Sequence, residues 1–191
     1  MKQFDAHYLF QAAGDIIDLN AWAPDNVIQE LEEFHKDSAN IKNSRDPNEL
    51  GAKIAYEYHK APDSWELPKN TTDVGYLEYN TGSFLYPHRD KWRKLHTNSV
   101  RCLCFLNYTR PTDYCFVYDN KIEVLEPGRW YAVNTQKVHY GFSFVDGVKH
   151  IGMALRFDDN ESVEWILDKL SFPQPIQTKT QENKDGVLKH F

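Results

Sequence analysis

Cysteine is scarce in this sequence, and its few cysteines form no recognisable disulfide framework. The three residues, Cys102, Cys104 and Cys115, include no Cys-x-x-Cys pair, and their number is odd. Small secreted domains usually contain an even number of cysteines that pair with one another. We therefore interpret these residues as reduced thiols, which favours a cytoplasmic protein.

Long apolar runs and an excess of positive charge are also missing. The sequence has no run of about 18 apolar residues, which a membrane-spanning helix would need, and residues 1–7 contain no apolar core of a secretory signal. The formal net charge is −6, whereas nucleic acids and anionic membranes are bound by basic surfaces. We expect neither a nucleic acid nor a membrane to be a partner.

The pattern of turns predicts a mainly β protein with one domain. The chain has 191 residues, of which 41% are hydrophobic and 14% aromatic, so a sizeable core is expected. From residue 73 onward, short apolar segments alternate with turn signals such as Asn80-Thr81-Gly82, Asp119-Asn120 and Asp146-Gly147. Seven or eight short strands at this spacing are typical of a jelly-roll or barrel. The predicted strands are 74–79, 99–108, 114–118, 121–125, 130–133, 139–145 and 149–157.

Helical patterns flank these strands. Pro24-Asp25-Asn26 precedes an apolar stripe within 27–34, which predicts a helix with a cap at Asp25 or Asn26. Further helical patterns occupy 50–59 and 160–170. We expect three parts within one domain: an N-terminal helical buttress (1–72), a double-stranded β-helix core of the jelly-roll, cupin-like type (73–158), and a C-terminal helix with a flexible tail (159–191).

Candidate metal ligands end the stretch 79–90, which reads YNTGSFLYPHRD. His88 and Asp90 are two residues apart, and on an extended segment alternate side chains share a face. His139, far along the chain, is the third candidate. Two imidazoles and one carboxylate leave coordination positions open and suit non-heme Fe(II). A His-x-Asp pair is common by chance, so it is informative only with its context.

That context resembles the 2-oxoglutarate/Fe(II) dioxygenases, in particular their prolyl 4-hydroxylase-like branch. The family carries a Tyr, a Gly three residues on, and the His of His-x-Asp nine residues after the Tyr; these match Tyr79, Gly82 and His88. It also carries a Gly and a Lys eight and ten residues after the distal His, which match Gly147 and Lys149. The resemblance covers about residues 73–157.

The resemblance implies roles for five residues. Fe(II) would be held by His88, Asp90 and His139, and would bind 2-oxoglutarate through its keto-acid end. Lys149 would bind the far carboxylate of 2-oxoglutarate, and Tyr79 would add a hydroxyl hydrogen bond to it.

Strand alternation gives separate support for the role of Lys149. It shares a strand face with Ile151, Met153 and Leu155, which we expect to line the barrel interior, and a lysine there needs an anionic partner. The neighbouring His150 is then expected to face outward. The alternative is that Lys149 lies in an exposed turn after Gly147.

Arg101 departs from the family pattern. It has the same inward parity as Leu103 and Phe105, where prolyl hydroxylases often have a small hydroxyl residue. It is a candidate second ligand for the co-substrate, a candidate clamp for a substrate carboxylate, or a structural ion-pair residue. The Gly-Gly-Glu-Thr-type stretch of prolyl hydroxylases is absent after Leu106-Asn107, so a prolyl substrate is not supported.

The implied activity is hydroxylation of an amino-acid residue or a small amino-acid-like substrate, with release of succinate and CO2. Fe(II) and 2-oxoglutarate would be required, with ascorbate as a candidate reductant. The substrate, a small molecule or a peptide, is not identified by the sequence. Candidates to line the mouth of the cavity are Trp92, Trp130, Tyr131 and Tyr140, and the basic loop 91–98 is a candidate lid for an acidic substrate.

Two other functions are compatible with the sequence. A cupin-like isomerase, lyase or hydrolase would use the same metal ligands without Lys149 and Tyr79. A non-enzymatic jelly-roll binding module would use none of them.

Overall fold

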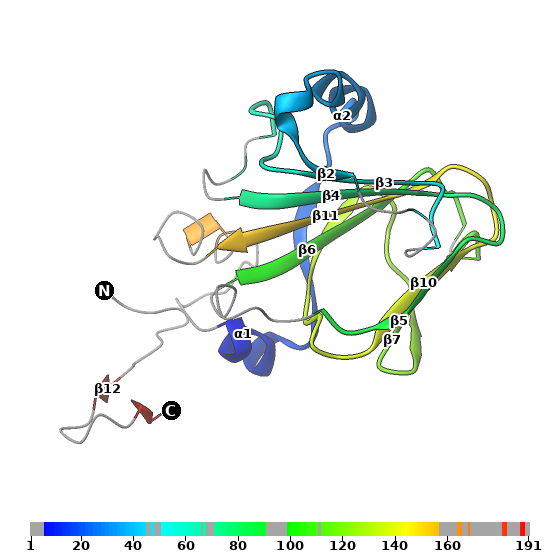
Figure 1. Ribbon diagram of the computed structural model, residues 1–191. Helices are drawn as coiled ribbons and strands as arrows, with labels where there is room; N and C mark the ends of the chain where they lie inside the picture. Colours follow the sequence, from blue (N-terminus) through cyan, green and yellow to red (C-terminus); the bar gives the residue numbers. More distant parts are fainter. Residues whose placement is uncertain are drawn as a thin grey trace.

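Two antiparallel β-sheets form the centre of the protein (Figure 1). The computed structural model describes residues 6–44, 47, 51–65, 67, 71–90, 99–110, 112–156, 164–165, 168, 181–182 and 188–189. No helix in this part of the chain is long and apolar enough to cross a membrane.

Consecutive strands from β4 to β11 lie in different sheets, except for the hairpin β7-β8, which lies in the smaller sheet. In the larger sheet they lie in the order β9-β6-β11-β4, and in the smaller sheet in the order β5-β10-β7-β8. This four-plus-four arrangement is a jelly-roll, so the predicted double-stranded β-helix core is confirmed. The strands are β4 (Thr71–Tyr79), β5 (Phe84–His88), β6 (Ser99–Leu106), β7 (Tyr114–Tyr118), β8 (Lys121–Glu123), β9 (Arg129–Val133), β10 (His139–Ser143) and β11 (Val148–Arg156).

Three strands from the N-terminal region extend the larger sheet. β1 (Ile16–Trp22) pairs with β9, and β3 (Ile54–Tyr58) pairs with β4 and with β2 (Ile41–Ser44). The prediction of a helix over 50–59 is therefore wrong. Its large residues Ile54, Tyr56 and Tyr58 recur every second position, which is the period of a strand.

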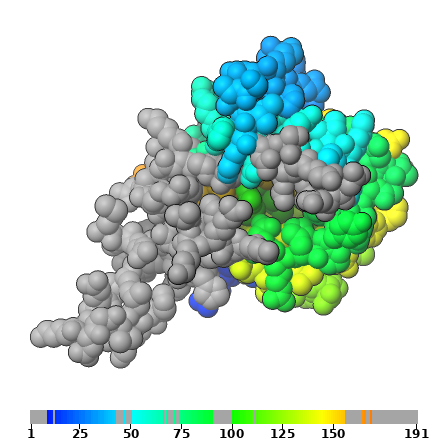
Figure 2. Space-filling view, viewed as in Figure 1, coloured from blue at the N-terminus to red at the C-terminus, as the bar shows by residue number. Residues whose placement is uncertain are grey.

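The described helices are α1 (Ala6–Ala13), α2 (Val27–His35) and the 3₁₀ turn η1 (Ser38–Asn40). The prediction of α2 is confirmed: Asn26 is its N-cap residue, although its side chain donates to Glu30 and makes no capping hydrogen bond. Figure 2 shows α2 as a blue ridge at the top of the molecule. The predicted helix 160–170 and the tail 171–191 lie mostly outside the described residues, apart from the short pair β12 (Gln181–Glu182) and β13 (Leu188–Lys189).

The larger sheet is buried on both faces, by two separate cores. One core packs its outer face against the helices, and the other lies between the sheets. Cys102 and Cys104 belong to the first core and Cys115 is also buried; all three are free thiols. The outer core includes Leu9, Val27, Leu31, Val74, Tyr76, Trp130, Ile151, Met153 and Leu155, and the inner core Tyr79, Leu103, Phe105, Tyr114, Phe116, Tyr131 and Val148.

Candidate metal centre

The three predicted metal ligands come together in the structure. One ligand atom from each of His88, Asp90 and His139 lies within 4.8 Å of the others. The two imidazole rings have centroids 4.3 Å apart, and Nε2 of His88 is 3.7 Å from Oδ1 of Asp90. Ligands for one ion must converge in this way, so the residue set fits a divalent metal.

Strand pairing and a bulge place the two histidines. β5 and β10 are antiparallel, and His139 lies opposite His88 while Gly141 lies opposite Leu85. β5 therefore has one more residue than β10 between these pairs, at Tyr86-Pro87. Side chains alternate along a regular strand, so in a strand without a bulge His88, three residues after the buried Leu85, would point to the opposite face. The bulge returns His88 to the face of Leu85. Proline, which has no N–H to donate, is tolerated at such an irregular position.

Backbone hydrogen bonds orient both imidazoles. Nδ1 of His88 is 2.7 Å from the carbonyl oxygen of Tyr86, and Nδ1 of His139 is 3.0 Å from that of Lys137. Because a carbonyl only accepts, each Nδ1 carries the hydrogen and each Nε2 keeps its lone pair for a metal. Burial lowers the pKa of His139 and favours the neutral form that a metal requires.

Arg101 and the segment after β9 hold Asp90 in place. The Arg101 side chain faces the cavity, as predicted, and its Nε is 3.7 Å from Oδ2 of Asp90. The backbone N–H of Asp90 donates to the carbonyl of Thr135 at 2.9 Å, and Nε2 of Gln136 donates to the carbonyl of Asp90 at 3.0 Å. These contacts leave Oδ1 directed toward His88.

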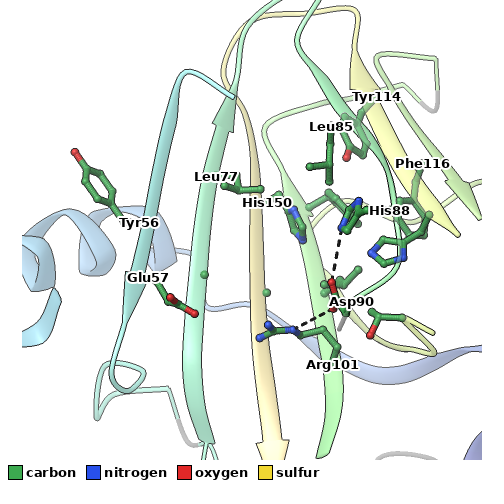
Figure 3. A pocket seen from close by; sticks show the side chains of 16 residues that line it. Tyr56, Glu57, Leu77, Leu85, His88, Asp90, Arg101, Tyr114, Phe116 and His150 are labelled. Carbon is green, nitrogen blue, oxygen red and sulfur yellow. Dashed lines mark ion pairs between the residues drawn. The ribbon is translucent and has the colours of Figure 1, made fainter. Parts of the chain in front are cut away.

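A cavity between the sheets contains this group of ligands (Figure 3). Its walls come from β3, β4, β5, β6, β7, β10 and β11. Among the described residues that line it, the charged side chains are Glu57, Asp90 and Arg101. Glu57 was not identified from the sequence, because it lies on a strand that the sequence pattern predicts as a helix.

Lys149 lies on the opposite face of the sheet from the cavity, so the prediction that it faces the interior is wrong. Its Nζ donates to Oε2 of Glu78 and to the hydroxyl of Tyr76, both at 2.7 Å. Ile151, Met153 and Leu155 do share its face, but that face packs against the helices. The anionic partner that a buried lysine needs is therefore Glu78.

His150 faces the cavity, and the prediction that it faces outward is also wrong. Its ring stacks on Phe105 with centroids 4.6 Å apart. Both ring nitrogens are buried without a hydrogen-bond partner, and burial lowers the pKa of His150 to about 3. The ring is therefore neutral near pH 7, with an unused donor and an unused acceptor.

Two buried tyrosines lie at the same end of the cavity. Tyr79 faces the interior and packs against Tyr114, which lines the cavity, with ring centroids 5.8 Å apart. Neither hydroxyl has a hydrogen-bond partner of normal geometry, and burial raises the pKa of both. Buried polar groups without partners are uncommon and need a reason.

Three residues predicted at the cavity mouth do not line it. Trp130 packs in the outer core, Tyr131 accepts a hydrogen bond from the backbone N–H of Glu126, and Tyr140 contacts Phe84 on the smaller sheet. Trp92 and the loop 91–98 lie outside the described residues.

No protein-family model and no curated protein matches the sequence at a significant level. Solved structures with a similar arrangement include a Pseudomonas putida prolyl-4-hydroxylase, 13% identical with a TM-score of 0.49, which covers 78% of this chain and 96% of its own. A viral collagen prolyl hydroxylase from Paramecium Bursaria Chlorella virus-1 is 14% identical with a TM-score of 0.44, over 73% of this chain and 92% of its own. A predicted oxalate decarboxylase from Thermotoga maritima is 12% identical with a TM-score of 0.42, over 63% of this chain and 96% of its own. At these values the likenesses assign no activity.

Proposed function

We propose that this protein is a non-heme Fe(II) oxygenase that uses 2-oxoglutarate as co-substrate and hydroxylates a C–H bond. The observation that carries the proposal is the convergence of His88, Asp90 and His139, with both imidazoles fixed through Nδ1 so that each Nε2 is available. Three protein ligands of this kind leave positions open for the co-substrate and O2.

The residues around the ligands have distinct tasks. His88, Asp90 and His139 would hold the metal, and Fe(II) with 2-oxoglutarate supplies the oxidation of the C–H bond when bound. Arg101 keeps Asp90 in its orientation through the 3.7 Å contact with Oδ2.

We assign the far carboxylate of 2-oxoglutarate to the end of the cavity lined by Tyr114 and His150, where Tyr79 packs against Tyr114. Each of these side chains has a buried polar group without a hydrogen-bond partner of normal geometry, and the two phenols and the imidazole can all donate to a carboxylate. Hydrogen bonds from three donors offset the loss of water around the carboxylate. This assignment replaces the one to Lys149.

Turnover assays with single-atom changes test this proposal. Tyr79→Phe and Tyr114→Phe should each raise the KM for 2-oxoglutarate by roughly tenfold, because a hydrogen bond to a charged group contributes about 1.5 to 3 kcal/mol. Tyr140→Phe, which changes a tyrosine on the smaller sheet outside the cavity, is the matched control and should leave the KM unchanged. Equal KM values for all three variants would contradict the assignment of the carboxylate.

The position of Lys149 favours one alternative function. A cupin-like lyase, isomerase or hydrolase would need the metal ligands but no lysine in the cavity, and Lys149 is engaged by Glu78 instead. Stoichiometric Mn(II) binding without any binding of 2-oxoglutarate would support this alternative over the oxygenase.

A further inference from the structure

We propose that Glu57 determines the substrate specificity of this cavity, by binding the ammonium group of an unbranched alkylamine whose carbon chain extends toward the metal ligands. The amine can be a free small molecule or the side chain of a lysine residue, since both present the same group. This inference rests on the proposed function, because it names the substrate class of the same site.

Glu57 is a charged side chain of the cavity wall that has no counterion among the described residues. It lies on β3, lines the cavity and is only partly exposed. It forms no ion pair and no side-chain hydrogen bond with another described residue. A carboxylate that is partly removed from water without a partner is unfavourable, so Glu57 favours a cationic ligand.

The metal and the co-substrate do not supply this counterion. Fe(II) carries a double positive charge, and 2-oxoglutarate with both carboxylates ionised carries a double negative charge. When both are bound, the negative charge of Glu57 therefore remains uncompensated. A substrate with a single positive charge balances it, whereas an anionic substrate would add to the repulsion.

Two glycines leave open space beside Glu57. In the larger sheet Glu57 pairs with Gly75, Gly75 with Gly152, and Gly152 with Leu103, so these residues form one row across β3, β4, β11 and β6. Both glycines line the cavity. A Cβ atom at Gly75 would meet nothing nearer than the carbonyl oxygen of Gly152, at 3.8 Å. A carbon chain can therefore lie directly above the backbone between Glu57 and Leu103.

This row of residues leads from Glu57 toward the metal ligands. Nε of Arg101 on β6 is 3.7 Å from Oδ2 of Asp90, which places the ligand group toward the β6 side of the sheet. Figure 3 shows Glu57 on one side of β4 and β11, and His88 and Asp90 on the other. Neighbouring strands lie about 4.8 Å apart, so β3 and β6 are separated by about 14 Å, which the Glu57 side chain and a short alkylamine can span together.

Apolar side chains form much of the cavity wall. They include Leu77, Leu85, Leu103, Phe105 and Phe116. Burial of methylene groups against such side chains is favourable, whereas a second polar group on the chain would lose its water. The wall therefore suits an unbranched alkyl chain with its charge at one end.

Proton relaxation of pentylamine, measured by NMR with Mn(II) in the metal site and 2-oxoglutarate in excess, tests the inference. Mn(II) relaxes nearby protons more strongly the closer they lie. Because the ammonium group is held at Glu57, we expect the methyl end of bound pentylamine to relax faster than the methylene next to nitrogen. The opposite gradient, which an amine coordinated to the metal would give, would overturn the inference.

Charge and space are tested separately by variants. Pentylamine should bind at least tenfold more tightly than the neutral pentan-1-ol, and Glu57→Gln should abolish this difference. Glu32→Gln, an equal charge change at an exposed position of α2, is the matched control and should preserve it. Gly75→Ala, whose new methyl group makes only ordinary contacts, should weaken binding of pentylamine without changing any charge. Equal affinity for amine and alcohol in the wild type, or unchanged pentylamine affinity in Glu57→Gln, would refute the role of Glu57.

A model of a lysine residue, Nα-acetyl-L-lysine N-methylamide, distinguishes the two sources of the amine. Binding of this compound that depends on Glu57 would identify a lysine side chain, and binding of pentylamine alone a free amine; both results support the inference. If neither compound binds while 2-oxoglutarate does, the inference fails and the proposed function stands. Amine binding at Glu57 without any binding of 2-oxoglutarate would instead leave this site standing and refute the proposed oxygenase.

Discussion

Replacing Lys149 with methionine separates a structural role from a role in binding the co-substrate. In the structure the lysine ammonium is held by Glu78 and Tyr76 on the helix-covered face of the larger sheet, away from the cavity. Methionine keeps an unbranched apolar chain of similar length and removes only the charge and the donors. We expect lower stability and unchanged binding of 2-oxoglutarate.

The loss of stability can be bounded from the contacts. Lys149 makes two hydrogen bonds of 2.7 Å, one of them to a carboxylate, and the side chains of Lys149 and Glu78 are only 11% and 13% exposed. Glu78 keeps a second partner, since Nζ of Lys53 is 3.1 Å from its Oε1. Because one charged hydrogen bond contributes about 1.5 to 3 kcal/mol, we expect Lys149→Met to lower the free energy of unfolding by about 2 kcal/mol.

Urea unfolding monitored by fluorescence measures this effect. With a slope of about 2 kcal/mol per molar urea, the midpoint should fall by about 1 M. Lys53→Met, which removes the more exposed partner of Glu78, is the control and should have a smaller effect. An unchanged midpoint together with lost binding of 2-oxoglutarate would show that Lys149 faces the cavity, and would refute the assignment of strand faces.

The pH dependence of stability gives a second test of the pair formed by Lys149 and Glu78. Burial alone would raise the pKa of Glu78, but the hydrogen bonds from Lys149 and Lys53 outweigh it and the pKa is lowered. The ionised carboxylate therefore stabilises the fold above the carboxyl pKa of the unfolded chain, and this contribution is lost as the pH falls through the pKa of the folded protein. Lys149→Met should flatten this acid dependence, and an unchanged dependence would argue against the pair.

Three further outcomes are expected. His150 has a pKa of about 3 in the fold and roughly 6.5 in the unfolded chain. As the pH falls from the higher value toward the lower one, the unfolded chain takes up a proton that the folded protein does not, so the free energy of unfolding should decrease by up to about 1.4 kcal/mol per pH unit. His150→Phe should remove this part of the slope in urea titrations at pH 7 and pH 5. Gly141→Ala places a Cβ 2.2 Å from the hydroxyl of Tyr114, and should lower the free energy of unfolding by about 1 to 3 kcal/mol; a wild-type midpoint would contradict this packing. Excess Mn(II) at about 100 times its Kd should stabilise the wild type by about 2.7 kcal/mol, and Asp90→Asn should lose most of this gain in thermal unfolding; equal gains would exclude Asp90 as a ligand.

The turn residues made the jelly-roll core predictable. Asp119 and Asn120 both have positive φ angles, 48° and 64°, which is the geometry of the tight hairpin that their sequence predicts. His88, Asp90 and His139 could also be identified from the sequence, because two imidazoles and a carboxylate are side chains that bind a metal. The turns depend on neighbours in the sequence and need no knowledge of strand register.

The sequence did not predict correctly which face of β11 lines the cavity. Its row Ile151, Met153 and Leu155 is the most apolar one, and such a row usually marks the interior of a barrel. Here the helices bury that row, and the cavity side carries His150 and Gly152 instead. A sheet covered on both sides has two buried faces, so hydrophobicity alone does not tell which one lines the cavity.

The bulge in β5 was equally hidden from simple alternation. Counting residues from Leu85 with a period of two points His88 toward the outside, yet the extra residue at Tyr86-Pro87 returns it to the interior. Proline is found at bulges and on edge strands, and β5 is an edge strand, so Pro87 alone does not signal the bulge. Register thus decided the site as much as residue identity did.

Anaerobic calorimetric titration of 2-oxoglutarate into Fe(II)- or Mn(II)-loaded protein tests the central claim most directly. The account predicts binding with a stoichiometry of one, dependent on the metal, lost in His88→Ala and retained in His59→Ala, which removes an exposed imidazole outside the cavity. Metal-loaded, folded protein that shows no such binding would contradict the assignment as a 2-oxoglutarate oxygenase.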